Sequence, residues 1–384
     1  MELKELERHL LTLATLPQTD APFISCYLNL ELGIPASHQA LDERARVVRR
    51  TLAGQSRQQF EEALGQIESY LRHDIHAGTA GVAIFACAEE QPFFLPLQFA
   101  VPLPNWVVVD VVPNIYHLLE LKDTYDRYVV LFCAETWARV LGLNLGTAIE
   151  DVRKELRQLH DRPDRDWTRD RYRNLRQQQI HQFIDDVIRI VNQMMSAGGY
   201  AHLVLAGHHK ILSQVRNALP THLEAKVVDI IPATEYDRVK DVIAATLESF
   251  VEQEERESQA VVERLQREVN TNGLAVTGTH ASFEALRWGQ VDTLVVAKAY
   301  EPSIGWTCRD CEAAGAGAPT SARCSQCHST RIRQLNVKEE MARMAEATGS
   351  AVEVVNHSEA LMRVGGVGCL LRFAGPEKYS AKAA

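Results

Sequence analysis

The chain has 384 residues, of which 46% are hydrophobic and 24% are charged, and its formal net charge is −9. This length predicts two or three domains, and this composition is that of an ordinary globular protein. The net charge argues against a surface that binds nucleic acid over its whole extent, so any such surface must be local. No apolar stretch reaches the roughly 18 residues of a membrane span, and the N-terminus lacks the basic start of a signal peptide, so we expect a cytoplasmic protein.

The first 124 residues predict a mixed domain of helices and strands. Residues 22–32 and 80–88 have the pattern of strands, and prolines separate two or more further strands in residues 92–113. A helix is predicted over residues 56–74, where apolar residues recur every three or four positions. The segment DERARVVRR (42–50) carries four arginines and is one candidate for a local basic surface.

The middle of the chain alternates strands and helices, which predicts an α/β domain with an at least partly parallel sheet. A long helix is expected over residues 168–197, and Gly198 and Gly199 are placed to end it. A second long helix is expected from about Asp237 to Asn270. Because it is charged on most faces, we interpret it as a solvent-bridging connector between domains. Strands are expected at residues 127–133, 137–145, 201–207 and 225–232.

The last part of the chain predicts a smaller α/β unit. A helix and a buried strand are expected within residues 273–300, another pair within 338–356, and a final strand after the glycines of GGVG (365–368). We therefore expect three domains: residues 1–124, 125–245 and 246–384, the last with a cysteine-rich insert at about 305–330.

Four of the eight cysteines form two Cys-x-x-Cys pairs within this insert. The spacing lets two tight turns direct four thiolates at one centre, which favours a structural Zn²⁺ site with no open position for a substrate. Four unrelated thiols, a disulfide, an iron–sulfur cluster and a redox pair remain alternatives, and His328 is a further candidate ligand. The predicted zinc ligands are Cys308, Cys311, Cys324 and Cys327, and the other cysteines (Cys26, Cys87, Cys133 and Cys369) are expected to be small buried hydrophobic residues.

The segment HDRPDRDWTRDRYRNLRQQQ (160–179) holds six arginines, four aspartates and one tryptophan. Such arginines can form paired hydrogen bonds with phosphates, and a tryptophan can stack on an unpaired base. The competing interpretation is a charged helix start in which arginines and aspartates pair locally. The predicted RNA-binding residues are Arg162, Arg165, Trp167, Arg169, Arg171, Arg173 and Arg176.

Other polar groups are weaker candidates. The histidines of GHHK (207–210) are interpreted as surface residues at a helix start, and His181 with Asp185 and Asp186 as a solvated helix face. A nuclease would need several carboxylates on strands, and residues 127–145 offer only Glu135, in a turn, so a nuclease is weakly supported.

Several of these features together resemble the archaeo-eukaryotic class-1 release factor and Pelota family. The family's C-terminal domain has an Ala-Leu-x-x-Gly-x-Val turn, matched by residues 285–291, and a Gly-Gly-x-Gly strand start, matched by residues 365–368. The strand AHLVLAG (201–207) is similar to one in its middle domain, and some members carry a zinc ribbon at the matching place. The resemblance is strong over 273–373 and weak over the first 124 residues, and the bacterial branch with the Balon-type ribosome hibernation factors is the most similar.

The resemblance implies a fold and a role. It implies an RNase-H-like middle domain, an L7Ae/Pelota-like C-terminal domain with a zinc-ribbon insert, and a decoding-site-like N-terminal domain. It also implies binding in the ribosomal A site, contact with rRNA, and elongation factor Tu or a similar translational GTPase as partner, with no small-molecule substrate.

The chain departs from the family at the segment that carries the chemistry. Release factors keep a Gly-Gly-Gln motif just before the long helix of the middle domain, whereas this chain has no glycine between Gly146 and Gly198. Because the glycines allow close approach to the ester, we expect no peptidyl-tRNA hydrolysis, and thus a non-catalytic hibernation or protective factor. A rescue factor that hydrolyses peptidyl-tRNA or cleaves tRNA, and an adaptor that acts through its C-terminal domain alone, are the alternatives.

Overall fold

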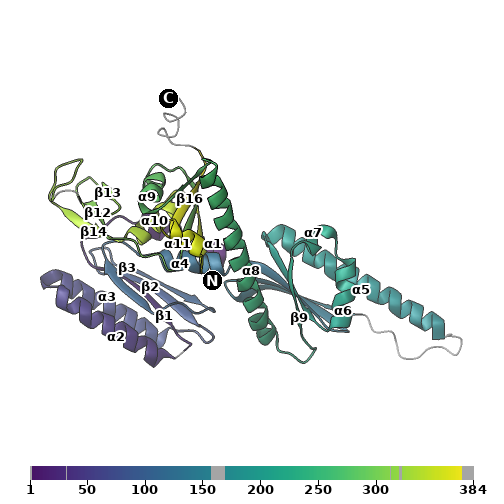
Figure 1. The fold of residues 1–384 in the computed structure, drawn as a ribbon. Coiled ribbons are helices and arrows are strands. Elements are labelled where there is room, and N and C mark those ends of the chain that lie inside the picture. The colour runs from purple at the N-terminus through teal and green to yellow at the C-terminus, as the bar shows by residue number, and fades with distance from the viewer. Residues whose placement is uncertain (1, 32, 157–168, 312, 320–321, 374–384) are drawn as a thin grey trace. The chain divides into compact units, whose positions relative to one another are not determined.

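A computed structural model describes residues 2–31, 33–156, 169–311, 313–319 and 322–373. They form two compact units (Figure 1). Unit 1 combines Leu3–Thr124 with the residues from Glu255 onward, and unit 2 is Tyr125–Glu254. The predicted middle domain therefore lies within unit 2. The predicted first domain and the predicted third domain from Glu255 onward share unit 1, whereas residues 246–254 of the predicted third domain belong to unit 2. No helix among the described residues is long and apolar enough to cross a bilayer.

The N-terminal part of unit 1 is built on a four-stranded antiparallel sheet in the order β3-β2-β1-β4. The helices α2 (Ile34–Thr51) and α3 (Gly54–His73) cover one face of the sheet and share its apolar core. The expected strands and the helix at 56–74 are confirmed. The four strands are β1 (Phe23–Asn29), β2 (Gly81–Cys87), β3 (Phe93–Phe99) and β4 (Trp106–Asp110).

The C-terminal part of unit 1 has a four-stranded mixed sheet in the order β10-β16-β11-β15, in which only β11 and β15 are parallel. The GGVG turn enters β16 with Gly365 and Gly366 at φ values of 101° and 75°. A Cβ at Gly366 would lie 2.9 Å from the Tyr300 ring, so both conformation and space require glycine there. The strands are β10 (Ala275–Thr277), β11 (Val291–Ala297), β15 (Ala351–Val355) and β16 (Val367–Leu371), and the helices are α9 (Thr279–Arg287), α10 (Val337–Ala347) and α11 (Glu359–Arg363).

The two parts of unit 1 are joined by two helices that the sequence did not place in one core. Helices α1 (Leu3–Thr15) and α4 (Tyr116–Thr124) pack against α10. Arg343 of α10 donates to the carbonyl oxygen of Ala14 at 3.0 Å, and Asp123 of α4 accepts from the amide of Val354 at 2.8 Å. The N-terminal segment is thus built into the same unit as the C-terminal segment.

Glu339 lies inside this junction. The side chain is only 8% exposed, and its carboxylate accepts from the amide of Tyr116 at 3.0 Å, at the start of α4. Burial raises the pKa of Glu339 from 4.5 to about 7, against the amides of Tyr116 and Ile115 and the charge of Lys338, which lower it, while Asp110 raises it further.

We expect this buried carboxyl to make the stability of unit 1 depend on pH. Because its folded pKa is raised, its stabilising contribution is complete below about pH 4.5 and is lost as the pH rises through about 7. The wild type should lose about 3 kcal/mol of unfolding free energy relative to Glu339→Gln between acidic and mildly alkaline buffer. Urea unfolding across this range measures the difference, and the exposed-site variant Glu43→Gln is the control. Parallel pH profiles for wild type and Glu339→Gln would contradict it.

Unit 2 has a five-stranded mixed sheet in the order β7-β6-β5-β8-β9, the RNase-H-like order expected for the middle domain. The last three strands in this order are parallel, which confirms the partly parallel sheet. β7 was not predicted, because this edge strand is charged and almost wholly exposed. The strands are β5 (Tyr128–Cys133), β6 (Trp137–Asn144), β7 (Thr147–Glu155), β8 (His202–Gly207) and β9 (Val227–Pro232).

One face of this sheet is covered by α5 (Arg169–Gly198) and α6 (His209–Ala218), and the short helix α7 (Thr221–Glu224) follows α6. As predicted, α5 ends at the glycine pair, and Gly199 has the left-handed φ of 67° that a helix C-cap needs. The long helix is therefore anchored at its C-terminal end by the sheet core.

The second long helix is α8 (Val239–Asn270). Its interpretation as a solvent-bridging helix was wrong, because some of its residues are buried in each unit. Val242 and Phe250 are buried in the core of unit 2, and Val262 and Leu265 are buried in unit 1. The apolar residues of α8 recur at helical spacing between charged residues. Each half of the helix therefore has a narrow apolar stripe that the high content of charged residues made hard to recognise in the sequence.

Candidate metal centre and RNA-binding surface

The cysteine-rich insert forms a small three-stranded antiparallel sheet in the order β13-β12-β14. Two turns bring its four cysteines together, so that each cysteine of the first turn meets one of the second. The Sγ–Sγ distances are 3.5 Å for Cys308–Cys327 and 3.5 Å for Cys311–Cys324, and all four Sγ atoms lie within 4.8 Å of one another. The strands are β12 (Gly305–Cys308), β13 (Ala314–Gly315) and β14 (Ile332–Leu335).

This arrangement fits a tetrahedral metal with four thiolate ligands. Zn–S bonds of about 2.3 Å in a tetrahedron put the sulfurs about 3.8 Å apart, close to the distances found. The backbone amides of Cys327 and Gln326 lower the pKa of Cys324 to about 7, and the amide of Asp310 lowers that of Cys308. These N–H donors favour the thiolate form of Cys308 and Cys324. Against the amides of Ala313 and Ser329, the neighbouring thiols raise the pKa of Cys311 to about 12 and raise that of Cys327, because four close sulfurs cannot all carry a charge without a cation between them.

His328 is not needed as a ligand. It is exposed, with a left-handed φ of 61°, and its amide donates to the carbonyl oxygen of Cys324 at 3.0 Å to close the second turn. All eight cysteines are free thiols, and the predicted burial of the four outside the insert is confirmed. Burial raises the pKa of Cys26, Cys133 and Cys369 to about 12.

The ribbon also contacts the N-terminal sheet of unit 1. Arg333 of β14 donates to Asp110 of β4 at 3.1 Å, and the two side chains are only 15% and 26% exposed. On its outer side, Asp310 binds both Ser329 and Arg331 across the two cysteine turns. The ribbon thus ties the cysteine-rich insert of the C-terminal segment to the N-terminal segment.

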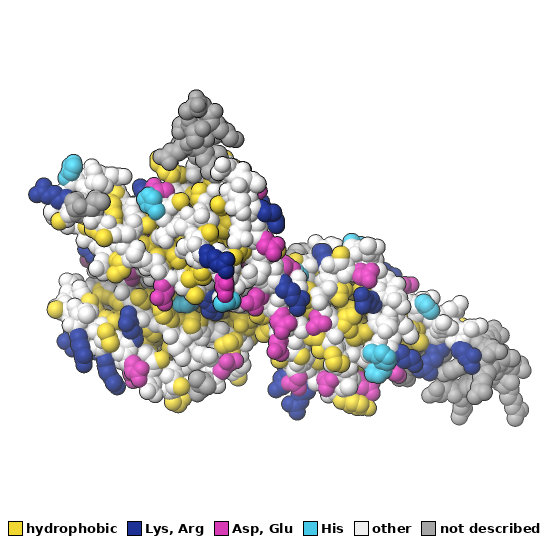
Figure 2. Space-filling view, viewed as in Figure 1, with side chains coloured by type: hydrophobic (Ala, Val, Ile, Leu, Met, Phe, Trp, Pro, Cys, Tyr) yellow, Lys and Arg dark blue, Asp and Glu magenta, His cyan; other side chains and the backbone are white. Residues whose placement is uncertain are grey.

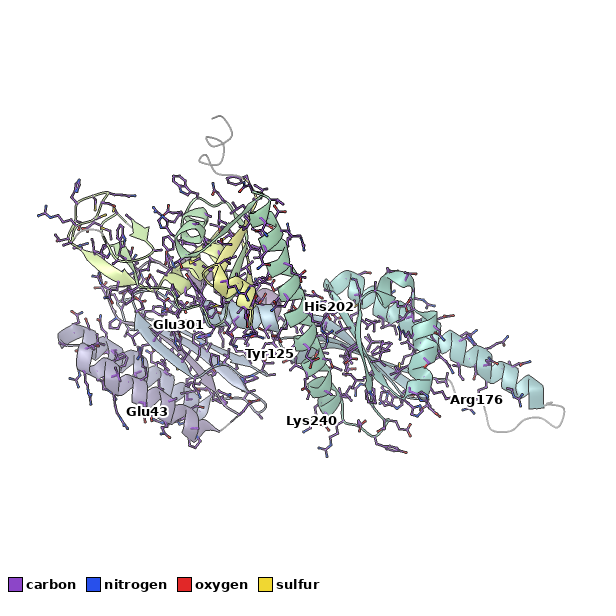
Figure 3. The ribbon with its side chains drawn as sticks, in the orientation of Figure 1. Glu43, Tyr125, Arg176, His202, Lys240 and Glu301 are labelled. Carbon is purple, nitrogen blue, oxygen red and sulfur yellow. The ribbon has the colours of Figure 1, made fainter. Side chains whose placement is uncertain are left out.

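The arginine-rich segment lies only partly within the described residues. Arg162, Arg165 and Trp167 fall outside them, and Arg169 and Arg171 belong to the first turn of α5, with side chains that are also outside. Arg173 and Arg176 are exposed on α5, where Figure 3 labels Arg176. RNA binding by the seven predicted residues therefore stays a prediction.

A groove runs between α5 and α6 in unit 2, next to these arginines. Its volume is about 790 Å³. Its lining combines two isoleucines with basic and amide side chains. Figure 2 shows Lys and Arg side chains over the N-terminal part of α5. The lining residues are Arg173, Arg176, Gln177, Ile180, His181, Ile184 and Asp185 of α5, and Lys210, Gln214, Asn217 and Ala218 of α6.

The α6 wall of this groove was missed from sequence. Lys210, Gln214 and Asn217 follow one another at i, i+4 and i+7, which puts them on one face of the helix. This spacing can be recognised in the sequence, but no sequence pattern indicates that this face of α6 lies opposite α5.

The remaining sequence candidates have structural roles. Asp186 pairs with Lys154 at 2.8 Å and with Arg189 at 3.1 Å, and Lys154 lowers its pKa. His208 caps the start of α6, as a surface histidine of the GHHK segment.

The arginines of the basic segment on α2 (residues 42–50) differ in their roles. Arg49 forms a two-pronged pair with Glu61 at 2.8 and 2.9 Å, and Arg44 donates to the carbonyl oxygen of Val107 in β4 at 3.0 Å. Arg46 and Arg50 are exposed. Two of the four arginines therefore serve the packing of α2, one against α3 and one against β4.

Comparison with known proteins gives the chain its relatives. Residues 113–255 match the model of bacterial archaeo-eukaryotic release factor family 10. The peptide chain release factor subunit 1 of Pyrococcus abyssi is 27% identical over 231 residues, which cover 53% of this chain and 56% of that protein. The chain thus spans little more than half the length of this curated relative.

Solved structures of related proteins align over most of the chain. Archaeoglobus fulgidus Pelota has 11% identity and a TM-score of 0.38 over 97% of this chain and 92% of its own. A model of ribosome-bound archaeal Pelota and ABCE1 has 15% identity and a TM-score of 0.41 over 97% and 94%. The family match and the sequence relative support the resemblance to the archaeo-eukaryotic release factor and Pelota superfamily, and the family that matches residues 113–255 is a bacterial one.

Proposed function

We propose that this protein is a ribosome-associated translation factor that occupies the A site without hydrolysing peptidyl-tRNA, as a hibernation or protective factor. Its relationship to a peptide chain release factor supports a role in translation. Elongation factor Tu or a similar translational GTPase is the proposed partner, and a structural Zn²⁺ held by the four cysteines is the proposed cofactor.

One observation carries the non-catalytic part of the proposal. No glycine occurs between Gly146 and Gly198, so the segment before α5 lacks the residues that let a backbone approach an ester closely. Six arginines and Trp167 occupy residues 160–179 instead. Guanidinium groups and an indole suit rRNA phosphates and unpaired bases, and they provide no group that positions an attacking water.

We expect the protein to sediment with 70S ribosomes from stationary-phase cells and to release no peptide from peptidyl-tRNA. Glu substitutions at Arg162, Arg165 and Arg169 should weaken ribosome binding by at least about tenfold at moderate salt, because each removes a phosphate contact and adds a repulsive charge. Arg238→Glu with Lys240→Glu, exposed cations of the same unit, is the matched control.

Two results would overturn the proposal. Absence of the wild-type protein from the ribosome pellet would remove the ribosomal role. Peptide release that is lost on changing Trp167 and Arg169 to Ala would instead make the protein a rescue factor.

A further inference from the structure

We propose that the groove between α5 and α6 binds a single-stranded segment of RNA. Arg173, Arg176 and Lys210 would hold its phosphates, and the amides of Gln214 and Asn217 would meet its bases. The inference rests on the proposed ribosomal function and adds a specific surface to it.

The groove is formed by matched stripes on two helices. The lining residues of α5 recur at three- and four-residue intervals from Arg173 to Asp185, a length of about 18 Å along the helix. The lining residues of α6 run from Lys210 to Ala218 on its facing side. A sheet core anchors both helices through Ile184 and Val215, so the two walls are held by the fold itself.

The charge of the groove is opposite to that of the chain. Three permanent cations face one carboxylate, Asp185, in a protein whose net charge is −9. Within the described residues, neither Arg173, Arg176 nor Lys210 has an ion-pair partner, in contrast to Arg189 farther along α5, which pairs with Asp186. Among the described side chains no carboxylate pairs with these cations, which favours the binding of an external anion.

The shape and chemistry of the groove favour single-stranded RNA. A volume of about 790 Å³ can hold a few nucleotides and is too small to enclose a double helix. Ile180, which is partly buried, can contact the face of a base, and the amides supply both donors and acceptors for base edges. An acidic peptide could meet the same cations and amides, so competition by poly-glutamate is one arm of the test.

The test measures binding of a fluorescent, single-stranded, mixed-sequence RNA to the full chain by anisotropy over a salt series. Lys210→Glu should weaken binding about five- to tenfold and reduce the salt-dependence slope by about one. Gln214→Ala with Asn217→Ala should reduce discrimination between oligonucleotides of different sequence. Lys240→Glu, the same charge change at an exposed site of the same unit, should bind as wild type does.

Several outcomes would reject the groove. They are wild-type affinity in Lys210→Glu, equal weakening in Lys240→Glu, and displacement of the RNA by a poly-glutamate peptide at lower concentration than by unlabelled RNA. Co-sedimentation separates the two levels of inference. If the wild type pellets with ribosomes and Lys210→Glu binds RNA normally, the groove fails and the proposed function stands. If the wild type does not pellet, the proposed function fails, while the anisotropy series still decides the groove.

Discussion

Loss of the metal should unfold residues 305–335 and loosen the N-terminal sheet of unit 1. Among the described residues, the ribbon's own buried core cluster is Cys308, Ala313 and Cys324, and the two cysteines are proposed zinc ligands. So small a core cannot offset the entropy of ordering the insert. Zinc bound by small finger peptides contributes about 10–16 kcal/mol, and four thiolates without a metal would repel one another.

The double variant Cys308→Ser, Cys311→Ser should therefore bind no zinc, whereas the wild type binds about one per chain. Amide exchange of β12 and β14 should rise to that of an unfolded segment. Exchange in β4 should also rise, because Arg333 then no longer holds Asp110. Mass spectrometry of the exchanged peptides, with elemental analysis of the protein, measures all three effects.

Cys369→Ala is the control, since this buried cysteine lies outside the cluster and its loss should leave the zinc content unchanged. A double variant whose ribbon stays protected would show that the metal is dispensable. Zinc-free wild type with a protected ribbon would do the same.

Phe250→Ala should be the most damaging single substitution in unit 2. Phe250 is wholly buried, and its ring stacks on that of Tyr128 with a centroid distance of 4.3 Å and an interplanar angle of 11°. This pair attaches the first half of α8 to the sheet. Removal of the Phe250 ring therefore leaves a cavity between α8 and the sheet. The expected cost is about 3–5 kcal/mol of unfolding free energy, a large share of the stability of a domain of this size.

Urea unfolding with hydrogen exchange locates the effect. Protection should fall throughout residues 125–254, with an unchanged slope of free energy against urea. Tyr236→Ala, at a residue that is 86% exposed in the same unit, should change the stability by less than about 0.5 kcal/mol. Equal stabilities for the two variants would show that α8 does not depend on this contact.

The sequence predicted most elements because their patterns are local. Buried strands such as β2 and β5, and helices with a regular apolar stripe such as α3, follow from side-chain periodicity alone. The strand β7 was not predicted, because an exposed edge strand has no buried face and therefore no alternation of apolar and polar residues. The role of α8 was misinterpreted because its few apolar positions are spread over two cores.

The site was predictable to the same extent. The four cysteines are recognisable from spacing, since each pair is a local turn, and only their pairing across the centre needed the structure. The attachment of Arg333 to Asp110 joins residues far apart in the chain, and no spacing signals such a contact. The position of Lys210 in the groove likewise depends on the packing of α6 beside α5, which the sequence does not indicate.

Unit 1 is assembled from two stretches of chain with the whole of unit 2 between them. During synthesis the N-terminal stretch leaves the ribosome first, but α10, which covers α1 and α4, emerges more than two hundred residues later. Until then Leu6 and Leu10 of α1, both wholly buried in the finished protein, lack the surface of α10 that helps to cover them. Unit 2 can meanwhile fold as a continuous segment, and its folding shortens the effective loop that must close. During synthesis, unit 2 can therefore be folded while unit 1 is still incomplete. In that state the N-terminal stretch of unit 1 is the segment most exposed to aggregation and to chaperones.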